Sequence, residues 1–377
     1  MRPSIFFLLC VPLLSADIDA VLKSAIGPKG FPGVAAMVAT GDKIVYQGAH
    51  GNASLQSLFR IWSMTKPVTS VAAMQLVERD KLDLDAPVGR YLPELATLNI
   101  LTGYDTRNHP ILTPARRQPT VRQLLSHTAG YGYVFWDDIL AKYPNKSGFM
   151  KAPLLFEPGT KWQYGVSTDI VGRIVERVSG QNLEEYFQQH IFQPLGMTDT
   201  TFFPDLALQK RLVKRANRQP DGTYSEEELP VPVAITPQGG GGLFSTVADY
   251  TRFMQMFLRG GQGILKRTTI QSMSRNQIGA LNVRRMISNS PAVTRDFGFH
   301  IEAEDKFGLG FQINPVAYKN GRAANSMTWA GVFNTFFWID LKSKLCAVVL
   351  MQSSPFFDEP AIKTLHEFEA AVYSKHR

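Results

Sequence analysis

The sequence predicts an α/β (α+β) fold in which both ends of the chain contribute strands to one antiparallel sheet. Strand-like patterns occur near the start, at residues 33–51, and return only at residues 308–352, with mainly helical patterns between them. The chain has 377 residues, of which 44% are hydrophobic and 19% charged, as is typical of a globular protein with a large core. We therefore expect a sheet flanked by helices, with a large and mostly helical lobe inserted between its two halves.

The first residues have the pattern of a signal peptide. Arg2 precedes an apolar run at residues 5–16 that ends in small residues, and acidic residues follow. This run is too short to be a stable membrane anchor. We expect residues 1–16 to be removed by cleavage near Ala16, so that the protein is exported, periplasmic or secreted, without stable membrane insertion. The alternatives are a buried first helix, which two prolines in this stretch disfavour, and an uncleaved protein that stays in the cytoplasm.

Residues 17–377 are expected to form a single domain of two lobes. The α/β lobe comprises residues 17–80 and 235–377, where the apolar periodicity changes between helical and strand patterns. In chain order, its expected elements are a helix at 18–25, a hairpin with strands at 33–40 and 43–51, helices at 63–79 and 248–258, strand-like runs at 308–315, 326–340 and 344–352, and a final helix at 359–373.

The helical lobe comprises residues 81–234. Pro, Gly and Asn separate its short helical patterns, and we expect no paired strands in this part of the chain. Its clearest helical patterns lie at residues 120–126, 168–179 and 182–190. A cleft between two such lobes is a natural place for a binding or catalytic site.

The net charge of +8 does not indicate a nucleic-acid partner. The 40 Lys and Arg residues are scattered, and apolar residues interrupt their densest cluster at 210–218. A nucleic-acid-binding protein would combine a basic stripe with a reader motif, and the sequence has none. The four glycines at 239–242 lack the lysine and the strand–helix setting of a phosphate-binding loop. Since no cluster of metal ligands stands out either, we predict no metal and no other cofactor, and we leave the oligomeric state open.

The first candidate catalytic group is Ser63-Met64-Thr65-Lys66, which Pro67 follows. Proline is tolerated only in the first turn of a helix, so Pro67 places the helix start at about Ser63. The residues after it are apolar nearly all round, which indicates a buried helix, and Ser63 and Lys66 share one face of that helix. The helix dipole and burial both favour a neutral Lys66 that could take the Ser63 proton, while backbone N–H groups, including that of Ser63, point at a developing oxyanion.

Taken alone, this tetrapeptide is weak evidence. Ser-x-x-Lys is expected about once by chance in a chain of this length, and Ser63 could simply cap the helix while Lys66 is solvated. A second element supplies a partner: Tyr164 lies just before the helix expected at 168–179 and could share the Ser63 proton with Lys66. The alternative is that Tyr164 is an aromatic residue of the rim that packs on Trp162.

The third element is Trp329-Ala330-Gly331, which lies in a strand-like pattern. Gly331 would let a substrate approach the backbone closely, and the N–H of Val332 could be a second oxyanion donor opposite Ser63. The alternative is a sheet strand in which the glycine only marks a bulge.

In this order and spacing, the three elements resemble those of the serine β-lactamase/penicillin-binding-protein superfamily, for which Ser-x-x-Lys is a known element. The chain is most similar to class C-like (family VIII) carboxylesterases and related acyltransferases. The resemblance extends over residues 17–371, and further matching stretches lie at 124–133, 156–176, 191–202 and 239–261.

The resemblance implies a β-lactamase/transpeptidase-like fold and a role for each matching residue. Ser63 would be the acylated nucleophile, Lys66 its base, and Tyr164 a shared base or acid that also serves deacylation. The backbone N–H groups of Ser63 and Val332 would form the oxyanion hole, and the Trp329-Ala330-Gly331 stretch would bind the substrate. The histidine of the 124–133 stretch, His127, would be mainly structural, because lysine and tyrosine already activate the serine.

Two departures from the family pattern bear on the substrate. The usual Tyr-x-Asn is Tyr164-Gly165-Val166 here, so the amide that contacts a β-lactam side chain is missing. The Lys-Thr-Gly strand motif is replaced by Trp329-Ala330-Gly331, so the cation that would meet a β-lactam carboxylate is missing too. Losing such a partner lowers recognition by orders of magnitude. Both changes favour a neutral ester over a penicillin.

We therefore predict a serine hydrolase that cleaves small-molecule carboxylic esters through an acyl-enzyme on Ser63. The alternatives at the same site are β-lactam or D-amino-acid peptide hydrolysis, or acyl transfer to an acceptor other than water. A non-catalytic scaffold with this fold is a third possibility, which the intact Ser63, Lys66 and Tyr164 oppose.

Overall fold

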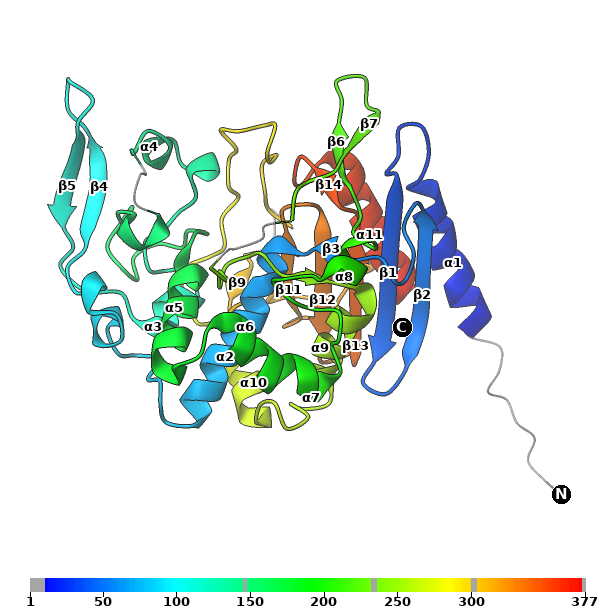
Figure 1. The fold of residues 1–377 in the computed structure, drawn as a ribbon, viewed down its shortest axis with the longest axis horizontal. Coiled ribbons are helices and arrows are strands. Elements are labelled where there is room, and N and C mark those ends of the chain that lie inside the picture. Colours follow the sequence, from blue (N-terminus) through cyan, green and yellow to red (C-terminus); the bar gives the residue numbers. More distant parts are fainter. Residues whose placement is uncertain (1–10, 145–147, 232–235, 300–303, 375–377) are drawn as a thin grey trace.

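The centre of the molecule is one antiparallel sheet assembled from both ends of the chain (Figure 1). The computed structural model describes residues 11–144, 148–231, 236–299 and 304–374. The strand order β2-β1-β13-β12-β11-β10-β9 pairs the N-terminal hairpin with a C-terminal strand, which confirms the predicted α/β fold. The strands are β1 (Gly33–Thr40), β2 (Ile44–Gly51), β9 (Lys306–Phe307), β10 (Gln312–Ile313), β11 (Met327–Gly331), β12 (Thr335–Asp340) and β13 (Leu345–Leu350).

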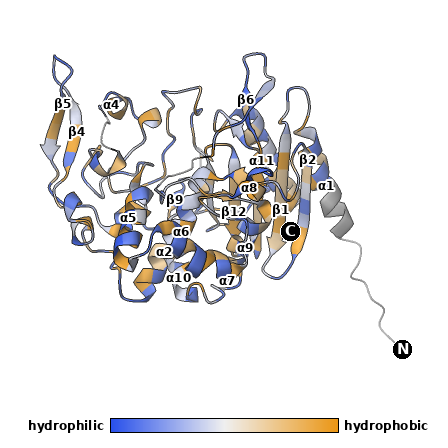
Figure 2. Ribbon diagram, viewed as in Figure 1, coloured by the Kyte–Doolittle hydropathy of each residue, from blue (hydrophilic) through white to orange (hydrophobic). Residues whose placement is uncertain are grey.

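Helices pack on this sheet from both ends of the chain and from its middle. Helix α1 (Val11–Ser24) contacts α11 (Glu359–Tyr373), and α9 (Val247–Leu258) contacts β1 and β13. Every residue of β12 and β13 is buried, which explains why these runs are apolar without alternation. Hydrophilic residues occupy the tips of the outlying hairpins instead (Figure 2).

The second lobe lies beside the sheet and consists mainly of short helices (Figure 1). Helix α2 (Thr65–Glu78) packs against α5 (Ser167–Ser179) of this lobe. The helices predicted at 120–126, 168–179 and 248–258 are confirmed within one residue. The remaining helices are α3 (Val121–Leu125), α4 (Asp138–Ala141), α6 (Leu183–Phe187, continued by a π-turn, Gln188–Phe192), α7 (Gln193–Leu195), α8 (Leu206–Gln209) and α10 (Arg267–Met273).

The expectation of no paired strands between residues 81 and 234 is wrong. Strands β4 (Asn99–Tyr104) and β5 (Pro110–Pro114) form a hairpin, and β6 (Arg215–Arg218) pairs with both β7 (Tyr224–Glu227) and β14 (Ser353–Ser354). Most residues of β5 and β7 are exposed, so backbone hydrogen bonds hold these strands without a buried face. They therefore lack the alternation of apolar and polar side chains from which a strand is predicted.

The first helix is longer than predicted. It begins at Val11 instead of residue 18, so the predicted cleavage position near Ala16 falls within it. Ile18 and Leu22 of this helix are buried in the hydrophobic core. Residues 1–10 of the predicted signal peptide lie outside the described residues, and export stays a prediction. None of the helices that the structure describes is both long and apolar enough to cross a membrane.

The strand-like run at 326–340 is divided into β11 and β12 by a turn at residues 332–334. Asn334 has a positive φ of 54°, the left-handed conformation that asparagine tolerates better than most residues. A short pair, β3 (Phe59–Arg60) with β8 (Phe244–Ser245), precedes the turn that carries Ser63. The Ile61 N–H then donates to the carbonyl of Leu243 at 3.0 Å, which attaches this turn to the segment before α9.

Candidate active site

Ser63 lies on a single 3-10 turn, Trp62–Met64, immediately before α2. The α-helix itself begins at Thr65, so the predicted helix start at Ser63 is two residues too early. Pro67 is the third residue of the helix, a position where its missing N–H leaves no intrahelical hydrogen bond unmade. Ser63 therefore lies in the turn that directly precedes a buried helix.

The backbone of this turn is strained. Trp62 has a positive φ of 43°, which is costly for a bulky residue. The Met64 N–H donates to the carbonyl of Ile61 at 3.0 Å. The N–H of Ser63 comes before this first bonded amide, and the opening N–H groups of a helix have no partner within it. In the described part of the chain no backbone carbonyl accepts from the Ser63 N–H, so a backbone donor accompanies the Ser63 hydroxyl.

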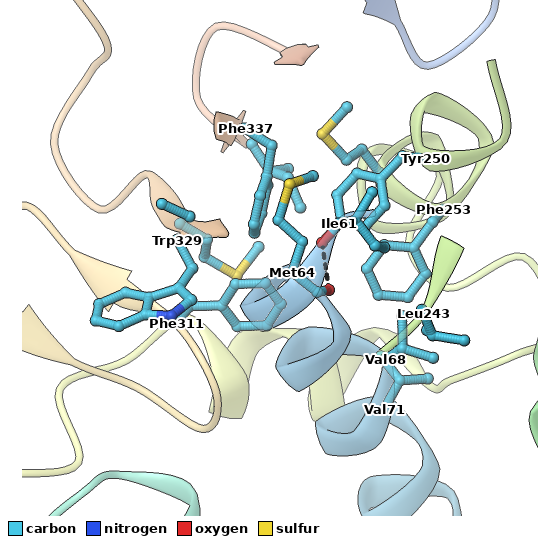
Figure 3. Packing of buried hydrophobic residues seen from close by; sticks show 14 of the residues in the cluster. Ile61, Met64, Val68, Val71, Leu243, Tyr250, Phe253, Phe311, Trp329 and Phe337 are labelled. Carbon is cyan, nitrogen blue, oxygen red and sulfur yellow. Dashed lines mark hydrogen bonds between the residues drawn. The ribbon is translucent and has the colours of Figure 1, made fainter. Parts of the chain in front are cut away.

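Packing holds the Ser63 turn in place. Figure 3 shows Met64 and Val68 embedded among Leu243, Tyr250 and other buried residues. The Tyr250 hydroxyl donates to the Met64 carbonyl at 2.9 Å, and the Leu243 N–H donates to the Thr65 hydroxyl at 3.3 Å. The turn is therefore fixed both by apolar contacts and by hydrogen bonds from the neighbouring segment.

Lys66 reaches back from the first turn of α2 to Ser63. Its ammonium Nζ lies 3.1 Å from Ser63 Oγ, 3.1 Å from the Tyr133 hydroxyl and 2.6 Å from the Gly240 carbonyl. The side chain is only 1% exposed. All three partners are neutral oxygens, so within the described ranges the buried Lys66 makes hydrogen-bond contact with the candidate nucleophile and with no carboxylate.

Tyr164 approaches Ser63 from the other side. Its hydroxyl donates to Ser63 Oγ at 2.7 Å and accepts a hydrogen bond from Trp329 Nε1 at 3.3 Å. The Tyr164 ring is buried and lies 4.9 Å from the Lys66 Nζ. The predicted trio of Ser63, Lys66 and Tyr164 is thus brought together within hydrogen-bonding distance.

The end of β11 forms one wall of the site. Trp329, Ala330 and Val332 line the cavity in front of Ser63, with Val332 at the start of the turn after β11. Gly331 is needed for a different close approach than the predicted one, because a Cβ at this residue would lie 2.3 Å from the Ile61 carbonyl and 2.3 Å from Thr335 Oγ1. The glycine therefore lets β11 pack against the Ser63 turn itself.

The cavity has a volume of about 520 Å³ and is predominantly aromatic. Both lobes contribute to it, with Tyr133 and Trp136 from one and Phe297 and Trp329 from the other. A ligand in it would contact many rings, which favours a largely apolar substrate, together with polar side chains such as Arg215, Asn217 and Gln238. The aromatic lining residues are Trp62, Tyr133, Phe135, Trp136, Phe149, Tyr164, Phe297, Trp329, Phe333 and Phe356.

Sequence reasoning assigned no role to Tyr133, although it lies in the 124–133 stretch of the resemblance. Its hydroxyl accepts a hydrogen bond from Lys66. Burial, followed by the charges of Tyr164 and Asp169, raises the pKa of Tyr133 well above its ordinary value, so this hydroxyl stays protonated. No periodicity marks a residue in this loop, and only the tertiary structure brings Tyr133 to Lys66.

Asp169 is the second residue that the sequence did not single out. It lies in the first turn of α5, lines the same cavity as Ser63, and accepts a hydrogen bond from the Gly240 N–H at 2.8 Å. Burial raises the pKa of Asp169 above its ordinary value, while the charge of Lys66 and the Gly240 N–H act in the opposite direction. The only feature of the sequence that could have pointed to Asp169 as a site residue is its position three residues after Val166. Residues at this spacing lie on the same face of a helix.

His127 lies behind the site and does not contact Ser63. Its ring packs against those of Tyr164, at a centroid distance of 4.9 Å, and Phe307, at 5.2 Å. Burial, and then the charge of Lys66, lower the pKa of His127 well below its ordinary value, so the imidazole stays neutral. This position suits the structural role that the resemblance implies. Across the described ranges, no group of three or more His, Cys, Asp or Glu side chains could hold a metal ion.

Comparison with known proteins gives the same family over nearly the whole chain. A family model described as "Beta-lactamase" matches residues 18–371. The lovastatin esterase of Penicillium rubens is 31% identical, over 90% of this chain and 90% of the relative. The ML-236A carboxylate methylbutanoyltransferase of Penicillium citrinum is 29% identical, over 96% and 94%.

A solved structure agrees with these sequence relatives. Simvastatin synthase (LovD) from Aspergillus terreus, in a mutant form, superposes with a TM-score of 0.85 at 27% identity, covering 97% of this chain and 95% of that one. These relatives are named for ester hydrolysis or for acyl transfer, which supports an enzyme of one of these two activities. The chain thus belongs to the β-lactamase family, within the serine β-lactamase/penicillin-binding-protein superfamily.

Proposed function

We propose that this protein is a carboxylic-ester hydrolase that acts through an acyl-enzyme on Ser63. The observation that carries the proposal is the contact of Ser63 Oγ with two groups able to exchange its proton, Lys66 Nζ at 3.1 Å and the Tyr164 hydroxyl at 2.7 Å. A serine hydroxyl is a weak nucleophile until a neighbouring base takes its proton. The burial of both partners supports this role, because it keeps competing water away from the proton transfer.

In the acylation step, Ser63 Oγ attacks the carbonyl carbon of the ester while its proton passes to Lys66 or Tyr164. The carbonyl oxygen becomes an oxyanion, for which the N–H groups of Ser63 and Val332 are the proposed donors. The bond between the carbonyl carbon and the alcohol oxygen then breaks. The alcohol leaves with the transferred proton, and Ser63 is left as an acyl ester.

Deacylation repeats these steps with water as the nucleophile. Tyr164 is the proposed base, since its hydroxyl touches Ser63 Oγ directly and is also bonded to Trp329. It would take a proton from the water that attacks the acyl carbon, and Ser63 would leave with a proton as its hydroxyl is restored.

A neutral and apolar ester is the proposed substrate. Trp329 occupies the place of a family lysine, and Val166 that of a family asparagine, so the two family groups that meet a β-lactam are replaced by apolar side chains. Arg215, which also lines the cavity, is paired with Glu227. The many rings of the cavity would instead stabilise an apolar group by burial. The name of the Penicillium rubens relative, lovastatin esterase, supports an ester of a bulky small molecule for this chain as well.

The experiment uses p-nitrophenyl butyrate with the wild-type protein and the Ser63→Ala variant. We expect a burst of p-nitrophenol equal to the enzyme concentration, lost in Ser63→Ala, and covalent labelling of Ser63 by a fluorophosphonate. If nitrocefin were hydrolysed far faster than any ester, the esterase proposal would be replaced by a β-lactamase. A protein without burst and without labelling would be a non-catalytic scaffold.

Acyl transfer is the second candidate, favoured by the transferase names among the relatives. It uses the same acyl-enzyme, but an alcohol held in the cavity attacks in place of water. Adding increasing concentrations of a bulky apolar alcohol during turnover of p-nitrophenyl butyrate separates the two. A transferase would form the new ester as its main product at millimolar alcohol, whereas a hydrolase would continue to release mainly butyrate.

A further inference from the structure

Asp169 has fewer hydrogen-bond donors than Asp249, another buried carboxylate of this protein. Asp249 accepts from the Asp199 N–H, the Thr200 hydroxyl and Arg252, at 2.7 to 3.0 Å. Asp169 accepts from the Gly240 N–H at 2.8 Å through Oδ1, and in the part of the chain that the structure describes no other residue donates to its Oδ2. A buried carboxylate is normally satisfied by two or three donors, so one acceptor is left over here.

This spare oxygen belongs to the catalytic cavity. Asp169 is 6% exposed and lines the same cavity as Ser63 and Gly240. A Cβ at residue 240 would lie 2.3 Å from Oδ2, so only glycine there leaves the carboxylate in its position. The local sequence thus keeps a carboxylate at the wall of a cavity whose other polar side chains include Arg215, Asn217 and Gln238.

Nearby charges compensate Asp169 without making hydrogen bonds to it. Lys66 and Arg173 both act on its carboxylate electrostatically. The Lys66 ammonium, however, is bonded to neutral oxygens, and Arg173 donates to Glu176 at 2.6 Å. Asp169 therefore has counter-charge nearby, which lowers the cost of its burial, while Oδ2 remains an unused acceptor.

The position of Asp169 relates it to the departure at Val166. The two residues are three apart at the start of α5 and both line the cavity. The wall next to Tyr164 thus presents an acceptor where the family pattern has an amide. An ionised carboxylate only accepts hydrogen bonds, so its partner must donate one. A hydroxyl group can donate such a hydrogen bond while the substrate stays neutral, in keeping with the neutral ester proposed above.

We propose that Asp169 is a specificity-determining residue that accepts a hydrogen bond from a hydroxyl group of the substrate. The proposal rests on the ester-directed function of Ser63 given above. The preferred substrate is then an ester that is apolar over most of its surface but carries one hydroxyl, in either its acyl part or its alcohol part. Such a hydroxyl would satisfy the spare oxygen, and an ester without it would leave that oxygen without a donor from the substrate.

The test measures kcat/KM for two series of matched esters. In the acyl series, phenyl 2-hydroxybutyrate and phenyl 3-hydroxybutyrate are compared with phenyl butyrate. In the alcohol series, 2-hydroxyethyl and 3-hydroxypropyl butyrate are compared with ethyl and propyl butyrate. Each value is divided by the rate of alkaline hydrolysis of the same ester, which removes differences in intrinsic reactivity.

We expect the ratio of kcat/KM for the hydroxylated ester to kcat/KM for the plain ester to be about 10- to 100-fold higher in wild type than in Asp169→Ala, in one of the two series. The series that shows this difference identifies the part of the substrate that carries the hydroxyl. Asp169→Asn should keep part of the preference, because its side-chain oxygen still accepts. Taking a ratio within each variant cancels any general loss of activity caused by the Gly240 contact.

Val166→Asn is a second variant that does not depend on removing the carboxylate. Its amide would donate to Asp169 from the adjacent position and so lower the preference as well. Ratios that agree within twofold between wild type and both variants, in both series, would overturn the proposal. Failure of the ester-directed function itself is a separate outcome, seen as turnover of the plain esters that survives Ser63→Ala.

Discussion

Two buried basic side chains, Lys66 beside the catalytic cavity and Arg322 beside helix α11, have opposite surroundings. Both side chains are nearly inaccessible, with residue exposures of 1% and 2%. Arg322 donates to both carboxylate oxygens of Glu369, at 2.8 and 2.6 Å. Lys66 donates only to two hydroxyl groups and one carbonyl. One of the two is thus paired with a charge, and the other is surrounded by neutral groups.

The difference distinguishes a structural from a chemical role. Although burial opposes it, the charge and hydrogen bonds of Glu369 raise the pKa of Arg322, so this group is permanently charged. The hydroxyls of Ser63 and Tyr133 can accept from an ammonium or donate to a neutral amine. Lys66 can therefore lose or gain a proton while its neighbours stay in place, as the proposed general base must.

Replacing Lys66 tests the chemical side of this comparison and should have the largest effect. We expect Lys66→Met, which keeps the volume of the side chain, to lower kcat/KM for p-nitrophenyl butyrate by about 100- to 10,000-fold, because the Ser63 proton loses its acceptor. The melting temperature should change by only a few degrees, since only neutral groups lose a hydrogen bond. Activity close to wild type would show that Tyr164 alone activates Ser63.

Replacing Arg322 tests the structural side. Arg322→Met leaves the Glu369 carboxylate buried without its cation, and we expect the free energy of unfolding to fall by about 3 to 5 kcal/mol in urea denaturation. The folded fraction should hydrolyse esters at the wild-type rate. In the double variant with Glu369→Leu most of the loss should be recovered, because no unpaired charge remains. A single variant as stable as the double one would mean that the ion pair contributes nothing.

The sequence was sufficient for those parts of the site that short motifs or strong periodicity mark. Ser63 and Lys66 share a helix face, Tyr164 precedes an amphipathic helix, and Trp329 lies in a mainly apolar, strand-like run. The sheet from both chain ends followed from the same patterns. These features depend on residues close together in the chain, for which spacing translates directly into geometry.

The parts that could not be predicted depend on tertiary contacts. Tyr133 meets Lys66 only because the loop before α4 folds over α2, and Asp169 meets Gly240 across 71 residues of chain. The positive φ of Trp62 has no sequence signal, because bulky residues rarely adopt it. The hairpin of β4 and β5 was missed because it has little buried face.

His127 is a third buried basic side chain, to be compared with Lys66 and Arg322. Its Nδ1 has no hydrogen-bond partner among the described residues. Since its pKa is lowered in the folded protein, the unfolded chain binds a proton below about pH 6.5 that the folded chain does not. Stability is therefore fully present above that pH and is lost as the pH falls. We expect this histidine to cost about 2 kcal/mol of unfolding free energy between pH 7 and pH 5.

The measurement is urea denaturation of wild type and His127→Asn at both pH values. Asparagine tolerates the left-handed φ of 56° at this residue and does not titrate. The loss of stability between pH 7 and pH 5 should be about 2 kcal/mol smaller in the variant. Equal losses in both proteins would mean that the folded protein accommodates a charged His127 behind Tyr164, against its surroundings of aromatic rings.

The smallest expected effect compares two tyrosines two residues apart. The Tyr133 hydroxyl contacts Lys66, whereas the buried hydroxyl of Tyr131 has no partner among the described residues. Tyr133→Phe should lower kcat roughly tenfold with little change in KM, because Lys66 loses one of its three neutral partners and is held less firmly against Ser63. Tyr131→Phe, the matched control, should leave kcat unchanged, since no hydrogen bond is lost. Equal kcat values for the two variants would mean that the hydrogen bond from Lys66 to Tyr133 does not contribute to catalysis. Lys66 and Arg322 would then differ only in whether a carboxylate lies beside them.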